Sequence, residues 1–142
     1  MSTWLSYWNK KTREGNKASL AGKVVAQIYV PWSKGLIKKG DTIYCFFIEG
    51  GAVHLVTRVE AASVKDDPDP AHKESVIITP KPSKVKAGYK RKVKKAVLGS
   101  IEYWHKDQAP GRSLKNPDYR RFQGPNSVRE LEAGAQHLDA AL

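Results

Sequence analysis

Apolar segments rich in β-branched and aromatic residues recur between polar turns, which is the pattern of a β-rich fold. They predict six strands, at residues 3–8, 23–30, 42–48, 52–64, 75–80 and 97–105. The segment 42–48 is almost entirely apolar, so we expect a buried strand there.

The strand predicted at 52–64 has a mixed pattern. Its middle alternates, so we expect Val53 and Leu55 on one face and His54, Val56 and Arg58 on the other.

Polar segments with Gly, Pro, Asn and Asp predict the connections. Pro31 ends the second strand because it lacks a backbone donor, and Glu49-Gly50-Gly51 predicts a hairpin. Residues 10–22, 38–41 and 66–70 are predicted as a loop, a turn and a loop, and residues 106–126 as one long connection.

The C-terminal segment 127–142 fits two structures. Ser127 and Glu130 match a capping box, which predicts one helix, but Gly134 interrupts it. We favour a short strand through Leu131 followed by a helix from about residue 132. The whole pattern predicts a mainly β, α+β fold: a small twisted β-barrel of about six strands with peripheral helices.

Composition narrows the class of protein. A length of 142 residues suits a single domain spanning 1–142, and 40% hydrophobic residues argue against general disorder. No apolar run approaches the roughly 18 residues of a membrane span, and the N-terminus has no secretory pattern. Cys45, the one cysteine, is expected to be a buried small hydrophobe, so we predict a cytoplasmic protein without disulfides. Because the four histidines have no metal-binding spacing, we expect neither a metal nor another cofactor.

The charge is strongly basic. Lys and Arg number 25 against 14 Asp and Glu, a formal charge of +11, which is typical of a domain that meets a polyanion. In the segment 81–95, eight of fifteen residues are Lys or Arg and none is acidic. It is either a solvated flexible arm or a grip on phosphates, and we favour the second. The candidate phosphate-binding residues are Lys10, Lys11, Arg13, Lys34, Lys84, Lys86, Lys90, Arg91, Lys92, Lys94, Lys95, Arg120 and Arg121.

Aromatic residues are concentrated in the first 47 positions. They are either core residues or a set of faces on which bases stack. Trp32 is the strongest candidate for stacking, because it follows Pro31 at the end of a strand. The candidate base-pocket residues are Trp4, Trp8, Tyr29, Trp32, Ser33 and Phe47.

Catalytic patterns are weak. The sequence has no HExxH, GxSxG or phosphate-loop motif. Asp66, Asp67 and Asp69 could suggest a metal-dependent nuclease, but we favour a solubilising loop without a fixed frame. His54 and His105 are expected to be hydrogen-bonded structural residues.

Three segments resemble the EVE domain of the PUA-like superfamily, which also contains YTH, ASCH and SRA-type domains. They are TWLSYWN, PWSKGLIKKGDTIYCFFIEGGAVHLVTRVEAA and SVREL. Trp4, Trp32 and Phe47 match aromatic positions of that pattern, whereas SKGLI after Trp32 replaces a usual Asn-rich, Arg-containing stretch. The resemblance covers residues 3–64 and 127–142, leaving the basic segment and the long connection as elaborations.

The resemblance implies a closed PUA-like barrel that reads a modified base. Related domains flip a base, often methylated or hydroxymethylated, into an aromatic pocket, and EVE domains occur with nucleases in modification-dependent restriction systems. We therefore expect a non-enzymatic reader of methylated or hydroxymethylated cytosine in duplex DNA, with any cutting done by a nuclease partner. One alternative is an RNA-binding module. Another is an ASCH-type enzyme for a modified nucleoside, for which Lys39, Thr42 and Glu49 are available.

Overall fold

The structure is a computed structural model with nine strands and two helices in the part that it describes. It describes residues 1–20, 27–50, 52–72, 74–81, 86–93, 102–104, 114–115, 128–133 and 135–140. For residues 17–20, 86–92, 102–104, 114–115, 129 and 132–133 it describes the backbone alone. The elements are β1 (Thr3–Tyr7), α1 (Lys10–Leu20), β2 (Ile28–Val30), β3 (Thr42–Glu49), β4 (Ala52–Asp66), β5 (Val76–Pro80), β6 (Lys86–Lys92), β7 (Glu102–Trp104), β8 (Leu114–Lys115), β9 (Val128–Ala133) and α3 (Ala135–Ala140).

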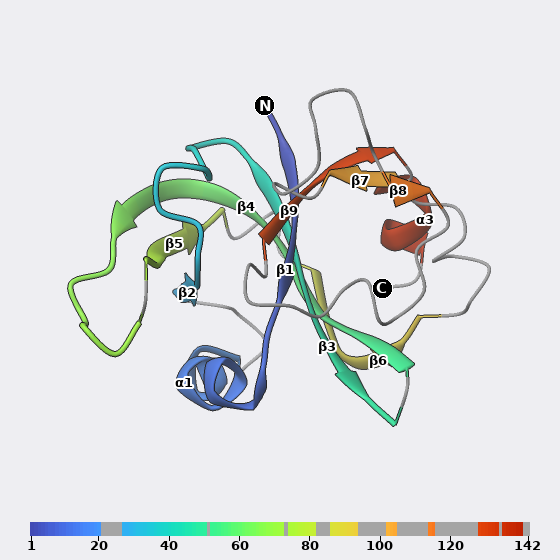
Figure 1. Cartoon of the computed structure of the whole chain (residues 1–142), viewed down its shortest axis with the longest axis horizontal. Coiled ribbons are helices and arrows are strands. Elements are labelled where there is room, and N and C mark those ends of the chain that lie inside the picture. Colours follow the sequence, from blue (N-terminus) through green and yellow to red (C-terminus); the bar gives the residue numbers. More distant parts are fainter. Residues whose placement is uncertain are drawn as a thin grey trace.

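The strands form one strongly curved mixed sheet (Figure 1). Its order is β2-β5-β4-β3-β1-β9-β7-β8, and β6 pairs with β4 beside this path. Among the described pairings, β1 with β3 is the parallel one. The mainly β, α+β class is confirmed. The described strands number nine rather than six, and their path ends at β2 and β8 without a described pairing between the two.

Strand β3 lies at the centre of the fold because both of its faces are apolar. Ile43, Cys45 and Phe47 belong to one core cluster, and Tyr44 and Phe46 to another. All five are at most 2% exposed. This confirms the predicted buried strand at 42–48 and Cys45 as a buried residue, and it shows that both faces of the strand are covered.

The predicted faces of β4 are partly wrong. The pairing of β4 with β3 shifts register between Cys45 and Phe46, so a bulge interrupts the alternation. Val56 therefore packs in the cluster that contains Phe47, whereas the Arg58 guanidinium reaches Asp139 on the side of Tyr44.

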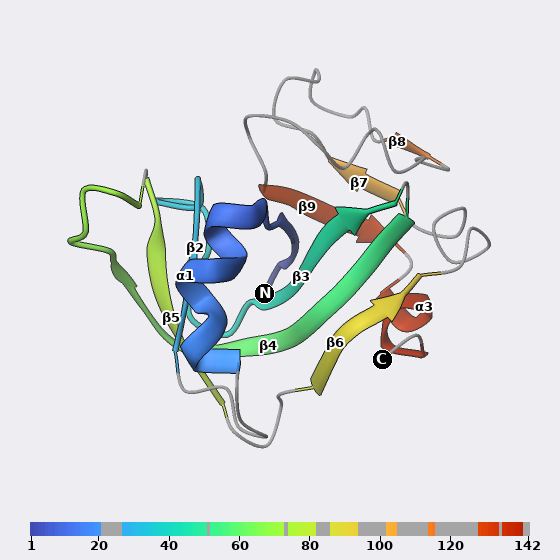
Figure 2. The ribbon, with the colours of Figure 1, turned by 90° about the horizontal axis from the view of Figure 1, so that it is seen from below.

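The loop predicted at 10–22 is wrong, because α1 occupies Lys10–Leu20. Asn9 caps this helix, since its Oδ1 accepts a 2.9 Å hydrogen bond from the backbone N–H of Thr12. The buried positions Thr12 and Asn16 are polar, so the sequence has no apolar stripe that would predict the helix. Figure 2 shows α1 crossing in front of β2.

Asn16 also covers the free edge of β2. Its side-chain amide accepts from the backbone N–H of Tyr29 at 2.9 Å and donates to the Tyr29 carbonyl at 3.0 Å, as a neighbouring strand would. Gly15 permits this close approach, because a Cβ at that position would lie 2.5 Å from Tyr29 Oη.

Part of the basic segment 81–95 is a strand, whereas the sequence had left a flexible arm as one alternative. Lys86–Lys92 forms β6, which pairs antiparallel with β4 in the register His54↔Lys92 and Leu55↔Arg91. Strand pairing fixes this part of the backbone along one edge of β4.

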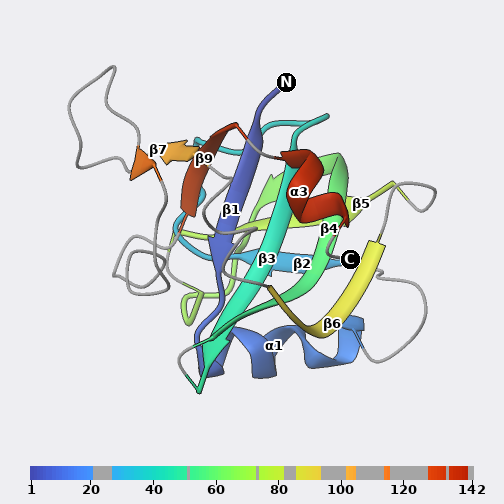
Figure 3. The ribbon, with the colours of Figure 1, turned by 90° about the vertical axis from the view of Figure 1, so that its right-hand side faces the viewer.

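The C-terminal segment confirms the favoured prediction of a strand followed by a helix. Strand β9 pairs with β1 and β7, and α3 packs against the central strands (Figure 3). Asp139 of α3 accepts from Tyr44 Oη at 2.6 Å and from Arg58 Nη1 at 2.8 Å.

The remaining predicted elements divide between described and undescribed residues. The hairpin at Glu49, the turn at 38–41 and the strands at 3–8, 42–48, 52–64 and 75–80 are confirmed. The strands at 23–30 and 97–105 are described only as Ile28–Val30 and Glu102–Trp104, and the 106–126 connection only at β8. The helices of the described residues include none that is long and apolar enough to cross a membrane.

Candidate nucleic-acid interface

Trp32 differs from the other tryptophans of the described side chains in its exposure. It is 40% exposed, whereas Trp4 is 9% and Trp8 is 0% exposed. Phe47, at 2%, is likewise a core residue. Tyr29 is 8% exposed, so of the five aromatic residues predicted at the base pocket Trp32 is the one that shows a broad surface to solvent.

Trp4 and Trp8 instead stabilise the core around β1. The Trp4 indole Nε1 donates a buried 2.9 Å hydrogen bond to Asp41 Oδ2. Trp8 Nε1 is buried without a hydrogen-bond partner, as is Ser6 Oγ two residues before it. A base could stack on Trp8 only after the surrounding core opened.

The backbone directs the Trp32 ring outward. We call residues 31–36 the Trp32 turn. Pro31 and Ser33, on either side of Trp32, are both buried. Trp32 itself has φ 61, in the left-handed region, which costs a residue with a Cβ roughly 1–2 kcal/mol. Strained backbone of this kind concentrates at functional sites, where the surrounding structure holds it in place.

Hydrogen bonds from Ser33 and Lys34 hold this strained turn. Ser33 Oγ donates to the Val30 carbonyl at 2.6 Å, so the hydroxyl is used inside the protein. The backbone N–H groups of Ser33 and Lys34 donate to the Glu74 carbonyl at 3.0 and 2.9 Å. Glu74 also has a positive φ, of 45°. Two strained residues therefore lie in turns that are bonded to each other.

Exposed lysines follow Trp32 along the chain. Lys34, Lys38 and Lys39 are all exposed, and Leu36 is 39% exposed. Lys34 Nζ lies 4.0 Å from Asp66 Oδ2, but both side chains are more than half exposed, so this ion pair is weak. Lys34 can exchange Asp66 for a phosphate at little cost.

A second group of predicted phosphate contacts lies on α1. Lys10 and Lys11 are exposed there. Arg13 lies over the Phe47 ring, with Cζ 4.4 Å from the centroid, and its Nη1 is 3.7 Å from Glu49 Oε2. His54 stacks on the same Phe47 ring at 4.9 Å. Arg13 therefore already makes contacts within the protein, although its Nε is buried without a hydrogen-bond partner.

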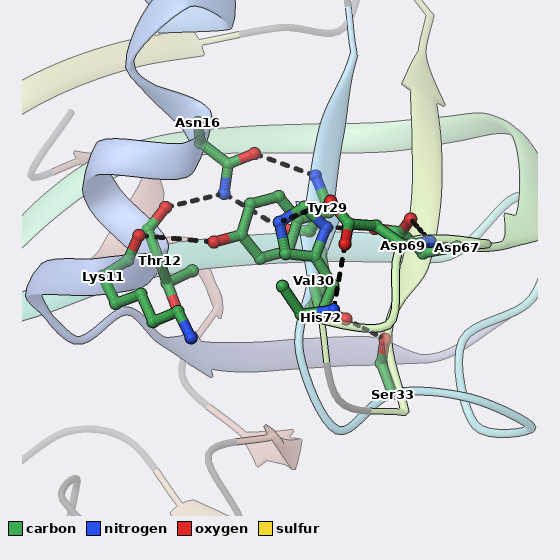
Figure 4. A network of polar contacts seen from close by, with 10 residues as sticks. Lys11, Thr12, Asn16, Tyr29, Val30, Ser33, Asp67, Asp69 and His72 are labelled. Carbon is green, nitrogen blue, oxygen red and sulfur yellow. Dashed lines mark hydrogen bonds and ion pairs between the residues drawn. The ribbon is translucent and has the colours of Figure 1, made fainter.

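A network around Tyr29 adjoins the Trp32 turn (Figure 4). The His72 ring stacks on the Tyr29 ring, with centroids 3.6 Å apart and planes 8° apart. Tyr29 is a predicted pocket residue, and this stack occupies one face of its ring. Burial, more than the nearby charges of Asp67 and Asp69, raises the pKa of the Tyr29 hydroxyl.

The acidic loop after β4 has a fixed frame, contrary to the prediction of a solubilising loop without one. Asp67 is 4% exposed at its side chain, and its Oδ2 lies 2.6 Å from His72 Nδ1. Sequence analysis missed this pair because its members lie in a loop, where no regular period places two residues five positions apart side by side. Among the described residues no group of three or more His, Cys, Asp or Glu could hold a metal ion.

The remaining predicted residues do not form one described site. Side chains of Lys86, Lys90, Arg91 and Lys92 are outside the description, as are Lys84, Lys94, Lys95, His105, Arg120 and Arg121 altogether. Thr42 and Glu49, from the enzyme alternative, begin and end β3. Seven residue steps of strand separate them by about 23 Å. Thr42 and Glu49 therefore lie at opposite ends of the same strand.

Comparisons with known protein families, with curated proteins and with solved structures found no match to this chain.

Proposed function

We propose that the protein is a nucleic-acid-binding domain that receives an unstacked base on Trp32. The observation that carries this proposal is a tryptophan that is 40% exposed and has a left-handed backbone, and whose two chain neighbours are buried. Stacking of one base on an aromatic side chain contributes roughly 1–3 kcal/mol. A strained backbone that presents part of a large apolar side chain to water is difficult to explain by stability alone, since the left-handed backbone opposes folding and the exposed surface contributes no burial.

Electrostatics supports an anionic polymer as the partner. The formal charge of +11 attracts phosphates, and three exposed lysines lie within seven residues of Trp32. Contacts of this kind position a nucleic acid and supply most of its affinity, whereas contacts to the base decide selectivity. Charge and stacking thus have separate roles, which mutations can separate.

The finer proposal is a reader of methylated or hydroxymethylated cytosine in duplex DNA, built on a PUA-like barrel. It is supported by the resemblance of residues 3–64 and 127–142 to EVE domains and by the match of Trp32 to the turn tryptophan. A base in a duplex must leave the stack to reach Trp32, at a cost of a few kcal/mol. Stacking offsets part of this cost, and a buried methyl group adds about 0.8 kcal/mol. Selectivity from the mark alone is then only about fourfold.

A competition experiment tests the proposal. The full chain is titrated with labelled duplexes that differ in one cytosine, unmodified, methylated or hydroxymethylated, and with a single-stranded RNA of the same sequence. We expect binding to nucleic acid, tighter for a modified duplex. The Leu36→Ala variant removes a neighbouring exposed side chain without a π face and is the matched control for Trp32→Ala. Preference for RNA would replace the DNA proposal, and equal binding by wild type and Trp32→Ala would overturn the role of Trp32.

A further inference from the structure

The loop between β4 and β5 lies against the Trp32 turn. We call residues 67–75, of which residue 73 is not described, the 67–75 loop. The contact is the pair of hydrogen bonds from Ser33 N and Lys34 N to the Glu74 carbonyl. Trp32 and Glu74 are the two non-glycine residues with positive φ in the described chain. Strain on both sides of one contact indicates that the two turns hold each other.

Hydrogen bonds inside the loop define its shape. Asp67 N donates to the Ser75 carbonyl at 3.1 Å and closes the loop at its base. Asp69 N donates to Asp67 Oδ1, and Ala71 N donates to Asp69 Oδ1, each at 2.9 Å. His72 N donates to the Asp69 carbonyl at 3.0 Å. Hydrogen bonds within the loop therefore hold the backbone from Asp67 to His72.

The His72 side chain joins the loop to strand β2 (Figure 4). Its Nδ1 lies 2.6 Å from Asp67 Oδ2, which accepts when Nδ1 carries the proton. Its ring stacks on Tyr29, whose backbone N–H and carbonyl are both bonded to Asn16 of α1. The imidazole thus joins the loop to β2 and through it to α1.

Glu74 follows His72 by two residues and precedes Ser75, which is buried. Glu74 is thus separated from His72 by residue 73 alone and is joined directly to the buried Ser75. A left-handed backbone at a tryptophan persists only where surrounding contacts over-determine it, because relaxation to negative φ is favourable by roughly 1–2 kcal/mol. Loss of the Glu74 contact would release that constraint at Ser33 and Lys34.

We infer that His72 is a positioning residue that, through Asp67, Tyr29 and Glu74, keeps Trp32 in its outward conformation. The role in binding rests on the proposed function, whereas the role in placing Trp32 does not. His72 gives the indole a fixed direction before a ligand arrives, so binding does not have to order it.

Two variants separate the contacts of His72. His72→Phe keeps a ring for stacking on Tyr29 but removes the hydrogen bond to Asp67, and His72→Ala removes both. His137→Ala, at an exposed histidine of α3, is the matched control. The first readout is the indole N–H resonance of Trp32 in the ligand-free protein, assigned by its loss in Trp32→Phe. The Trp4 and Trp8 resonances report whether the core is intact.

We expect His72→Ala to shift or broaden the Trp32 resonance and to leave the Trp4 and Trp8 resonances in place. His72→Phe should change the Trp32 resonance by a smaller amount, and His137→Ala should leave it unchanged. We expect Kd for the preferred nucleic acid to rise about threefold to tenfold in His72→Ala, part of the full stacking contribution. An unchanged Trp32 resonance in the folded His72→Ala or His72→Phe protein would overturn the inference. A moved resonance with unchanged Kd would keep the positioning role and contradict the proposed function of Trp32.

Discussion

The Trp4 indole N–H donates a buried 2.9 Å hydrogen bond to Asp41 Oδ2, across 37 residues of chain. The same carboxylate accepts from the backbone N–H groups of Ser2 and Lys38, each at 2.9 Å. Asp41 is 3% exposed and so ties the first strand to the turn before β3. Trp4 therefore contributes to the fold, in contrast to the exposed Trp32.

A double-mutant cycle measures this bond. Trp4→Phe and Asp41→Asn should each destabilise the protein, and we expect a coupling energy of about 1.5–3 kcal/mol between them, because the acceptor is charged. Chemical denaturation of the four proteins gives the value. The cycle of Trp8→Phe with Asp41→Asn is the control, since Trp8 Nε1 has no hydrogen-bond partner. Equal coupling in the two cycles would contradict the assignment.

The left-handed backbone of Trp32 predicts an unusual order of stability at that position. Trp32→Gly and Trp32→Ala both remove the ring, but glycine adopts positive φ without strain. We expect Trp32→Gly to be at least as stable as Trp32→Ala, by up to about 1–2 kcal/mol. At an ordinary exposed position Ala would be the more stable variant, so that order, measured by denaturation, would argue against the strained turn.

Tyr44 should make the protein sensitive to alkaline pH. Burial, followed by the hydrogen bond and charge of Asp139, raises the pKa of the Tyr44 hydroxyl above its ordinary value of 10.0. The folded state thus binds this proton more tightly than the unfolded state. The associated stability is fully present below pH 10 and is lost as pH rises from there towards the folded pKa.

The measurement compares wild type with Tyr44→Phe. At pH 8 the variant should be the less stable, because it lacks the 2.6 Å bond to Asp139. Above pH 10 the free energy of unfolding should fall more steeply in wild type, by at most about 1.4 kcal/mol per pH unit for one proton. Contributions of other tyrosines are common to both proteins. Parallel pH profiles would contradict the raised pKa.

The basic segment predicts steep salt dependence of binding. Substitution of Lys90, Arg91, Lys92, Lys94 and Lys95 by Ser should weaken binding to all sequences alike and keep any preference for a modified base. Each lost phosphate contact should reduce the slope of log K against log salt by about 0.9 on duplex DNA. Circular dichroism checks that β6 still forms. A Kd that hardly changes between low and moderate salt would exclude the phosphate grip.

Much of the strand framework was accessible from the sequence because apolar periodicity reports it directly. β3 and β5 are short runs of β-branched and aromatic residues, and the hairpin at Glu49 has the expected glycine. Helix α1 was missed because its buried residues, Thr12 and Asn16, are polar and act through hydrogen bonds. The bulge in β4 likewise leaves no sign in a pattern of alternation.

The site was only partly accessible for a similar reason. Proximity to Pro31 singled out Trp32 as the strongest candidate, but the sequence could not show that Trp4 and Trp8 are core residues, because all three are the same residue type. The exposure of each tryptophan depends on which parts of the fold pack against its ring. The contact of Glu74 with Ser33, 41 residues away, depends on tertiary structure alone.

The most direct test of the account combines a melting curve and a binding titration on Trp32→Ala. Trp32 is already 40% exposed, so we expect a small change in melting temperature. Affinity for the preferred duplex should fall by roughly 1–3 kcal/mol, and preference for the modified base should shrink at an unchanged salt slope. A core cavity would instead cost roughly 3–5 kcal/mol of folding free energy and lower the melting temperature strongly. Such a drop, with an unchanged preference for the modified base in the folded fraction, would contradict the account.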